Sequence, residues 1–459
     1  MIEWFYRQCV IPGFESVWKR RKTLHYLAQL EESQWWSRQR LEELQLQRLR
    51  LLLTHCYQHS QYFKKLWDKL GLRPVDVESL ADFAHWPITS SDTMRDSAKE
   101  IRTSLPEKGC VRKRTGGSSG RPLEFSIDLA ANERRIAGSH RGYAWAGATL
   151  GTRQTYLWGM PLGAGSHQHA WKDQLYNRYL YRRDFINSFD MHEKQAPSLV
   201  DRINGYRPQL IVAYTNPLYS LARDIEQQQL QVAAPTALIV GAEKLHDYQR
   251  QMIERVFRAP VFETYGSREF SLIGAECERH LGLHLTQENL LVEIVDHDGM
   301  PTPAGQEGDV VITDLFNKAT PFVRYAIGDR GIAGFDSCPC GRGLPLLRKI
   351  AGRQLDVLIT ADGRRLAGEY FPHLLKEYSA VRQYQVVQRQ RDLIELKYVV
   401  DRPWELESRE TLRQTIQQSI GTSTKLLMLE VPSVSLTPAG KLRVVVSHCA
   451  QQASIPTVL

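Results

Sequence analysis

A stretch rich in glycine and hydroxyl residues, TGGSSGRP from Thr115 to Pro122, is the first part of the sequence whose composition suits chemistry. The amides and hydroxyls of such a loop can hydrogen-bond phosphate oxygens, and an arginine can add a charge-assisted contact. We therefore predict a phosphate-binding loop. Its residues are Thr115, Gly116, Gly117, Ser118, Ser119, Gly120 and Arg121.

Other interpretations of this loop are a Walker A motif, a hydrolase nucleophile elbow and a plain surface linker. The Gly-Lys-Ser/Thr ending of a Walker A loop is absent. The Gly-x-Ser-x-Gly pattern of an elbow is present around Ser118, but an elbow needs an apolar strand before it and a helix directly after it. Here three basic residues precede the loop and Pro122 follows it, which disfavours the elbow. A surface linker stays open for this loop taken alone.

Three charged residues elsewhere fit the needs of a nucleotide site. Glu269 follows a predicted strand, where a carboxylate could hold Mg²⁺. Asp329 lies in a Gly-Asp turn and could accept hydrogen bonds from ribose hydroxyls. Lys441, in a Pro-Ala-Gly-Lys turn, projects a cation that could bridge a carboxylate and an α-phosphate. Taken singly, each also fits an ordinary surface carboxylate, Asx turn or solvated lysine.

Cysteine and histidine residues form a second set of candidate ligands. Cys277 and His284 are followed by Cys338 and Cys340, a number and type of ligand that suits a closed tetrahedral Cys₃His site for structural zinc. His280 is the alternative imidazole. The spacing is unlike that of a zinc finger, and buried free cysteines are the competing interpretation.

The elements that must position the nucleotide residues lie between Gly205 and Glu269. Short apolar runs alternate there with amphipathic stretches, which predicts a β-α-β-α-β unit. The predicted elements are a strand at 209–214, a helix from about 216 to 229, a strand at 237–240, a helix at 246–258 and a strand at 261–264. Such units give parallel sheets whose strand carboxyl ends bind ligands. The exits at Tyr214, Gly241–Glu243 and Tyr265–Glu269 are therefore expected on one edge.

The rest of the chain predicts two domains of α/β class. The residues from 24 to 70 have helical spacing, 289–296 and 309–315 read as strands, and 392–400 and 408–420 read as a strand and a helix. We predict a large domain over 1–352, with a helical part over about 1–100, doubly wound parallel sheets and a β-rich subdomain. A small α+β domain is expected over 353–459.

Six segments in order resemble motifs of the adenylate-forming superfamily, and in particular its phenylacetate-CoA ligase-like, CapK-like and coenzyme F390 synthetase-like branch. The resemblance runs from about residue 30 to Arg443. The phosphate loop is similar to the family's, with Arg121 where many members have Lys. The other matches are Gly241-Ala242-Glu243 on the adenine side, Tyr265-Gly266 through Glu269, Arg324 through Asp329, the hinge motif at Gly352-Arg353 and the loop of the catalytic Lys441.

The resemblance implies roles for these residues. Lys441, Glu269 and Arg324 would be catalytic, Glu269 would bind Mg²⁺, and Arg353 would lie beside the nucleotide. The branch resembles this chain around the cysteines too, which strengthens the zinc prediction and favours His284, in Gly-Leu-His, over His280. The hinge departs from the usual pattern, since Leu355 takes the place of the first acid and leaves Asp356 as the candidate pivot.

The reaction that the resemblance implies has two steps. ATP and a carboxylic acid give an acyl-AMP and pyrophosphate, and rotation of a mobile small domain then presents a second face for transfer, with CoA as the expected acceptor. The alternative acceptor is a cofactor hydroxyl or a sugar in capsule polysaccharide biosynthesis. A distant alternative function is that of a catalytically silent nucleotide-binding protein. Aromatic residues between Tyr143 and Trp158, with Tyr214, favour an aryl or other apolar acid.

Bulk properties narrow the partners further. The formal charge of +8 favours polyanions, yet the cluster at Lys19–Lys22 reads first as a solvated face, so we expect no nucleic acid and at most peripheral membrane contact. No apolar run approaches the roughly 20 residues of a membrane span. The N-terminus lacks a signal-peptide pattern and the seven cysteines do not form a disulfide framework, so we expect a cytoplasmic protein. The oligomeric state does not follow from the sequence.

Overall fold

The fold is taken from a computed structural model of the 459-residue chain. It describes residues 2–105, 109–115, 123–158, 175–188, 195–334, 337–353, 357–363, 365–367, 370–375, 378, 380–400, 402–434 and 443–449. The chain divides into two compact units. The larger comprises Met1–Ile327 and Gly331–Ile350, and the smaller comprises Gly328–Arg330 and Ala351–Leu459.

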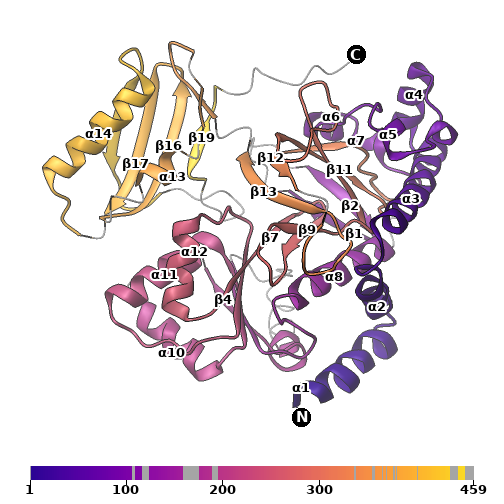
Figure 1. The fold of residues 1–459 in the computed structure, drawn as a ribbon, viewed down its shortest axis with the longest axis horizontal. Helices are drawn as coiled ribbons and strands as arrows, with labels where there is room; N and C mark the ends of the chain where they lie inside the picture. Colours follow the sequence, from indigo (N-terminus) through magenta and orange to yellow (C-terminus); the bar gives the residue numbers. More distant parts are fainter. Residues whose placement is uncertain are drawn as a thin grey trace. The chain divides into compact units, whose positions relative to one another are not determined.

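Helices form the first hundred residues of the larger unit (Figure 1). Ser60 separates two of them, because its hydroxyl accepts a hydrogen bond from the amide of Phe63 and so caps the second. Gly71 ends that helix with a φ of 70°, a left-handed conformation that favours glycine. The helices are α1 (Ile2–Phe5), η1 (Tyr6–Val10), η2 (Gly13–Trp18), α2 (Thr23–Ser33), α3 (Arg38–His59), α4 (Gln61–Leu70), η3 (Pro74–Asp76), α5 (Leu80–Phe83), α6 (Ser91–Asp96) and α7 (Ala98–Ile101).

An eleven-stranded mixed sheet runs through the larger unit in the order β10-β11-β12-β13-β9-β8-β7-β6-β5-β3-β4. The predicted parallel part and the β-rich part are therefore one continuous sheet. A separate hairpin, β1 (Cys110–Arg114) with β2 (Glu124–Asp128), leads into α8 (Leu129–Ala144). The sheet strands are β3 (Gln154–Trp158), β4 (Arg183–Asn187), β5 (Leu210–Tyr214), β6 (Ala237–Gly241), β7 (Val261–Ser267), β8 (Ser271–Glu276), β9 (Leu283–Leu285), β10 (Leu290–Val295), β11 (Glu307–Asp314), β12 (Tyr325–Ala333) and β13 (Leu346–Arg353).

The five strands from β4 to β7 in this order are parallel, and β7 to β9 are antiparallel. In the order β4-β3-β5-β6-β7, β4 is added on one side of β3, and the next strand in the chain, β5, is added on the other side. This reversal makes the sheet doubly wound, as predicted, and places its switch point between β3 and β5. A ligand of an open α/β sheet binds at that point, outside the strands' carboxyl ends.

Three helices pack against the parallel strands: α10 (Ala196–Tyr206), α11 (Thr215–Gln227) and α12 (Asp247–Phe257) (Figure 1). Their apolar side chains share one core with strand residues such as Ile211, Leu238 and Val240. The strands are buried because helices cover them, which explains the continuous apolar runs in the sequence. The predicted β-α-β-α-β unit is confirmed, with boundaries that differ by a few residues. A π-helical turn, η4 (Tyr176–Leu180), precedes β4.

The smaller unit has its own apolar core, which includes Phe371, Ile394, Tyr398 and Leu412. A four-stranded sheet in the order β18-β17-β16-β19 carries this core together with one long helix. The elements are β14 (Val357–Ile359), β15 (Arg365–Ala367), α13 (Tyr370–Leu375), β16 (Val381–Gln390), β17 (Leu393–Val400), α14 (Leu406–Ile420), β18 (Lys425–Glu430) and β19 (Val445–Ser447). Among the described residues, no helix combines the length and apolarity needed to cross a membrane.

Candidate functional site

The switch point of the sheet carries two aromatic residues, one at the end of each flanking strand. Trp158 ends β3 and Tyr214 ends β5, and their ring centroids are 4.2 Å apart. Burial raises the pKa of Tyr214, with Glu243 adding to the shift and Arg268 opposing it. Residues of three predicted exit loops therefore share one electrostatic environment at this edge.

The exit of β6 is shaped by close approach to its neighbour β7. A Cβ atom at Gly241 would lie 2.5 Å from Oγ1 of Thr264, so a larger residue does not fit there. Ala242 then adopts a φ of 67°, which turns the chain sharply. The carboxylate of Glu243 accepts a hydrogen bond of 2.9 Å from the amide of Asn216 in the first turn of α11, where the helix dipole favours a negative charge.

The segment from Tyr265 to Glu269 lies beside the hairpin that begins the predicted phosphate loop. Gly266 sits at an irregularity in the pairing of β7 with β8, where a Cβ would come within 2.4 Å of the carbonyl oxygen of Ser271. Arg268 donates a hydrogen bond of 3.1 Å to the carbonyl of Arg114 at the end of β1. The structure thus brings Glu269 and the start of the loop together within the larger unit.

The described part of the phosphate loop is its first residue. Thr115 exchanges two hydrogen bonds with Leu123, one between its amide and the Leu123 carbonyl and one from the Leu123 amide to its hydroxyl, each 2.9 Å long. These bonds fix the two ends of the loop next to each other. Gly116, Gly117, Ser118, Ser119, Gly120 and Arg121 lie outside the described residues.

Lys113 is a candidate that sequence reasoning missed. Burial lowers the pKa of its ammonium group to about 8, with Arg135 and Arg268 contributing, while Glu269 opposes the shift. A partly buried cation therefore stands near the predicted Mg²⁺ ligand, two residues before Thr115. The available signal was the basic run at 112–114, which we interpreted only as evidence against a nucleophile elbow.

Arg324, which we expected to be catalytic, is enclosed by protein partners in the structure. The residue is 1% exposed, and all of its guanidinium nitrogens have partners. Nε donates a hydrogen bond of 3.2 Å to Glu293, which also forms an ion pair of 3.0 Å with a terminal nitrogen. The carbonyls of Ala84, Trp86 and Gly299 accept the other hydrogen bonds. No donor is left for a phosphate. Its φ of 42° is unusual for a residue other than glycine. In the structure Arg324 therefore ties the start of β12 to the helical region, and we expect it to act as a positioning residue.

Four further candidates belong to the smaller unit. Asp329 is buried within β12, in the segment Gly328–Arg330 that groups with that unit. Arg353 is the last residue of β13, and its side chain lies outside the described part of the chain. Lys441 and the hinge candidate Asp356 also lie outside it.

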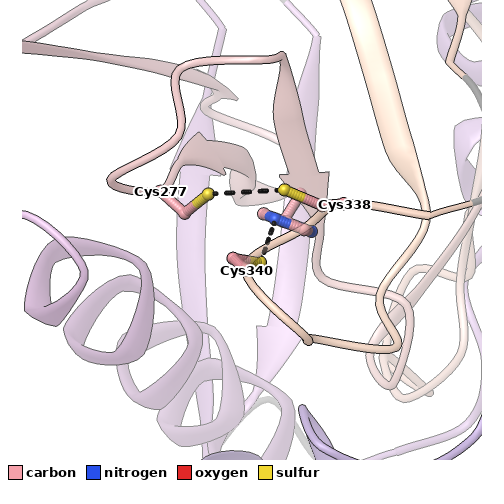
Figure 2. A group of neighbouring side chains, drawn as sticks. Cys277, Cys338 and Cys340 are labelled. Carbon is pink, nitrogen blue, oxygen red and sulfur yellow. Dashed lines mark hydrogen bonds between the residues drawn. The ribbon is translucent and has the colours of Figure 1, made fainter.

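The cysteine and histidine candidates do come together. Cys277 follows β8, His284 lies in β9, and Cys338 and Cys340 precede β13, while β9 pairs with both β8 and β13. The four ligand atoms all lie within 4.8 Å of one another. Figure 2 shows the sulfur atoms turned toward a common centre. Adjacent strands therefore assemble a cluster from residues far apart in the sequence.

The distances in this cluster suit a tetrahedral metal ion. The sulfurs of Cys277 and Cys338 are 3.8 Å apart, which matches the ~3.8 Å expected between two ligands at about 2.3 Å from zinc and is far too long for a disulfide. Nε2 of His284 lies 3.3 Å from the sulfur of Cys340. Nδ1 of His284 lies 3.2 Å from the carbonyl oxygen of Leu344, a contact that orients the ring. Of the two imidazoles considered, His284 is the one in the cluster.

The protonation of the cluster depends on burial. Burial raises the pKa of Cys277 to about 12 and lowers the pKa of His284 to about 4, so the imidazole is neutral. Burial opposes ionisation at Cys340 too, but hydrogen bonds from Arg342 outweigh it and the pKa of this thiol is lowered. His280 instead contacts the carboxylate of Glu276 at 3.1 Å. A divalent cation would favour the thiolate form of all three cysteines.

Comparison with known proteins finds relatives of the smaller unit and of most of the chain. Residues 358–448 match the family described as the CapK C-terminal domain. The phenylacetate-coenzyme A ligase of Thermus thermophilus is 26% identical over 444 residues, which covers 88% of this chain and 96% of that protein. Protein CapK of Staphylococcus aureus is 22% identical and covers 94% of both chains. A crystal structure of 2-hydroxyisobutyryl-CoA ligase with 2-HIB-AMP in the postadenylation state has a TM-score of 0.69 at 20% identity, covering 89% of this chain and 90% of that one.

The doubly wound sheet and the small α+β unit have the fold of the adenylate-forming CoA ligases. Over most of its length the chain is similar to phenylacetate-CoA ligases and to CapK, and its smaller unit matches the CapK C-terminal domain. The family resemblance and the fold class predicted from the sequence are both confirmed.

Proposed function

We propose that this chain activates a carboxylic acid with ATP and transfers the acyl group to CoA. In the first step a carboxylate oxygen attacks the α-phosphorus, the α–β phosphoanhydride bond breaks, and pyrophosphate leaves. In the second step a thiolate attacks the acyl carbon and AMP leaves. The observation that carries the proposal is the convergence of Tyr214, Gly241–Glu243 and Tyr265–Glu269 at the carboxyl edge of the parallel strands, next to the sheet's switch point.

The roles of the residues follow from their chemistry. Thr115 and the loop after it would hold phosphates, Gly241–Glu243 would border the adenine, and Asp329 would accept hydrogen bonds from the ribose. Glu269 would be a ligand of Mg²⁺, which when bound neutralises charge on the phosphates. Lys113 adds a cation beside Glu269. Lys441 would contact both the carboxylate and the α-phosphate, stabilising charge that develops between them.

The chemistry at the switch point favours an aryl or other apolar acid. Trp158 and Tyr214 present two aromatic rings in contact at the strand ends. Tyr143 and Trp158 both pack against an apolar cluster that includes Tyr156, so this cluster supports the rings from the core. An acid with a flat or apolar body would bury against such rings, while its carboxylate would face the nucleotide.

CoA is the acceptor that we favour, since relatives and structural neighbours are named as CoA ligases. The match of the smaller unit to the CapK C-terminal domain supports keeping a second acceptor class under test. That class comprises a hydroxyl or amine on a sugar, or a hydroxyl on a cofactor.

Pyrophosphate exchange into ATP tests the first step. Wild-type protein, Mg²⁺ and a panel of aryl, fatty and amino acids are compared with Lys441→Ala and with Lys425→Ala, an exposed lysine of the same unit. We expect exchange that depends on one acid, falls by about 10²–10³-fold in Lys441→Ala, and is unchanged in Lys425→Ala.

Product analysis with CoA, with sugar amines and with no acceptor tests the second step. A thioester formed only with CoA supports the proposal. Acyl-AMP that accumulates with CoA but disappears with a sugar amine would overturn the choice of acceptor and leave adenylation intact. ATP binding without exchange for any acid would overturn carboxylate activation.

We further propose that the cluster of Cys277, His284, Cys338 and Cys340 binds structural zinc. The support is the ligand set, its spacing within 4.8 Å and the orienting contact between His284 and Leu344. All four positions are protein ligands, so the site would be closed and would stabilise the fold rather than take part in the reaction.

A further inference from the structure

The first helical segment of the chain exposes an unusual number of large apolar side chains. Trp4 is 65% exposed, Phe5 53% and Trp18 69%. Exposed apolar residues scattered singly are normal, but a group of aromatic residues on one segment indicates a binding surface. Together with neighbouring side chains they form what we call the N-terminal patch: Ile2, Trp4, Phe5, Val17, Trp18, Leu175, Tyr176 and Tyr179.

Buried and hydrogen-bonded contacts fix this segment to the larger unit. Ile11 is 2% exposed, the hydroxyl of Tyr6 donates a hydrogen bond of 2.8 Å to the carbonyl of Tyr179, and the ring of Phe14 lies 5.7 Å from that of Tyr176. The buried carboxylate of Glu15 accepts a hydrogen bond from Tyr181. Figure 1 shows α1 at the N-terminal end of the ribbon. The exposed aromatic residues are therefore held outward on an anchored helix.

Positive charge borders the patch. Four consecutive basic residues, Lys19 to Lys22, follow Trp18, and all four are exposed. Arg21 pairs with Glu15 at 3.2 Å, whereas Lys19, Arg20 and Lys22 form no ion pair with any described residue. The surface thus combines aromatic side chains with uncompensated cations.

We propose that the N-terminal patch docks this protein onto the surface of an anionic lipid bilayer. Tryptophan and tyrosine concentrate at membrane–water interfaces, because one part of the ring system is apolar and the other is wet. A helix that lies in the interface is held by apolar burial together with attraction between basic residues and anionic headgroups. A protein partner that covered the patch would not require four adjacent cations beside it. The negative headgroups of an anionic lipid leaflet do complement these cations.

The attachment would be peripheral and reversible. Within the N-terminal segment the apolar side chains of the patch lie near its two ends, with polar residues such as Gln8 and Ser16 between them. Such a surface rests among headgroups and does not cross the bilayer. The inference does not depend on which acid or acceptor the enzyme uses.

Sedimentation with vesicles tests this directly. Full-length protein is mixed with vesicles of phosphatidylcholine alone or of phosphatidylcholine with phosphatidylglycerol, at low and high salt. We expect binding to the anionic vesicles that weakens at high salt, and little binding to phosphatidylcholine.

Two pairs of variants separate the apolar and the electrostatic contributions. Trp4→Ser with Trp18→Ser, and Lys19→Ala with Arg20→Ala, should each reduce partitioning by about tenfold. Matched controls outside the patch are Val75→Ser with Leu406→Ser, both exposed apolar residues, and Lys64→Ala with Lys69→Ala, both exposed cations. The controls should bind vesicles like the wild type, and thermal unfolding should be unchanged in all four.

Several results would overturn the proposal. Wild-type protein that fails to sediment with anionic vesicles would do so, as would patch variants that bind as well as the controls. A concentration-dependent dimer in analytical ultracentrifugation that Trp4→Ser with Trp18→Ser abolishes, without vesicle binding, would assign the patch to contact between two copies of this chain.

Discussion

The cysteine–histidine cluster and the proposed nucleotide site at the carboxyl edge of the parallel strands are built in different ways. The cluster draws four ligands from loops and strands of one sheet, and hydrogen-bonded neighbours hold all ligand atoms within 4.8 Å. The nucleotide candidates are distributed over strand exits of the larger unit, a segment that groups with the smaller unit, and Lys441. The cluster lies entirely within the larger unit, whereas the proposed nucleotide residues come from both units.

This contrast has a physical basis. A structural metal site stabilises the fold when its ligands are already fixed, so buried strands suit it. A site that adenylates and then transfers must admit two different second substrates, so its groups are supplied by loops and by a separable unit. Ligands fixed on hydrogen-bonded strands therefore indicate a structural role here, and polar groups at the strand exits indicate chemistry.

Arg324 gives the strongest test of that contrast, because it stands in a nucleotide motif but is buried like a cluster residue. Arg324→Met should lower the free energy of unfolding by about 3–5 kcal/mol, since it leaves the Glu293 carboxylate buried without its partner. Urea unfolding followed by fluorescence measures this. Arg38→Met, an exposed helical arginine paired with Glu42, should change it by less than about 1 kcal/mol.

The double variant Arg324→Met with Glu293→Leu should recover part of the lost stability, because no buried charge is left unpaired. A normally stable Arg324→Met protein with strongly reduced pyrophosphate exchange would contradict the positioning role and restore the catalytic one.

Glu269 tests the second half of this contrast, the prediction that residues at the strand exits carry the chemistry. Glu269→Gln keeps the size of the side chain but removes its charge, so pyrophosphate exchange should fall by about 10²-fold while the unfolding curve stays unchanged. Exchange rates across a Mg²⁺ titration should show that the loss is partly overcome at high Mg²⁺.

The matched control is Glu42→Gln, a helical carboxylate of the larger unit, which should leave exchange unaffected. Wild-type exchange in Glu269→Gln at limiting Mg²⁺ would remove this carboxylate from the site, and attention would move to other acids at the strand exits.

The cluster predicts a stability effect tied to metal content. Cys277→Ser should lose the zinc expected in the wild type and lower the unfolding temperature by ~5 °C, because the remaining ligands cannot close a tetrahedral site. Elemental analysis and calorimetry on the same samples measure both. Cys9→Ser, at an exposed cysteine, is the control.

Metal-free wild-type protein whose unfolding temperature does not respond to added zinc would contradict the site. A Cys277–Cys338 crosslink detected by mass spectrometry would replace it with a redox pair.

Local patterns made much of the fold predictable. The β-α-β-α-β unit was predictable because buried parallel strands read as continuous apolar runs between helices. The insertion of β13 beside β9 was not, since strand order among distant segments leaves no local pattern.

The candidate site was less predictable than the fold. The motif around Arg324 singled out this residue but did not predict its burial, because its guanidinium is occupied by carbonyls of Ala84, Trp86 and Gly299. Lys113 was missed because its lowered pKa comes from burial and neighbours that only the fold brings together.

Glu263 in β7 offers a smaller test, because it is a partly buried acid at the boundary between the two regions. Burial raises its pKa to about 7, with Glu276 contributing. Between pH 4.5 and 7 the unfolded chain ionises this carboxyl while the folded chain keeps it protonated, so stability falls as the pH rises through this window. Glu263→Gln should remove that loss, so that its stability relative to wild type grows by about 3 kcal/mol from pH 4.5 to pH 8. Urea unfolding of both proteins at each pH measures the difference, in which titrations common to both proteins cancel. A difference that is constant with pH would show that Glu263 is ionised in the fold, and that Arg250 compensates it more strongly than its burial implies.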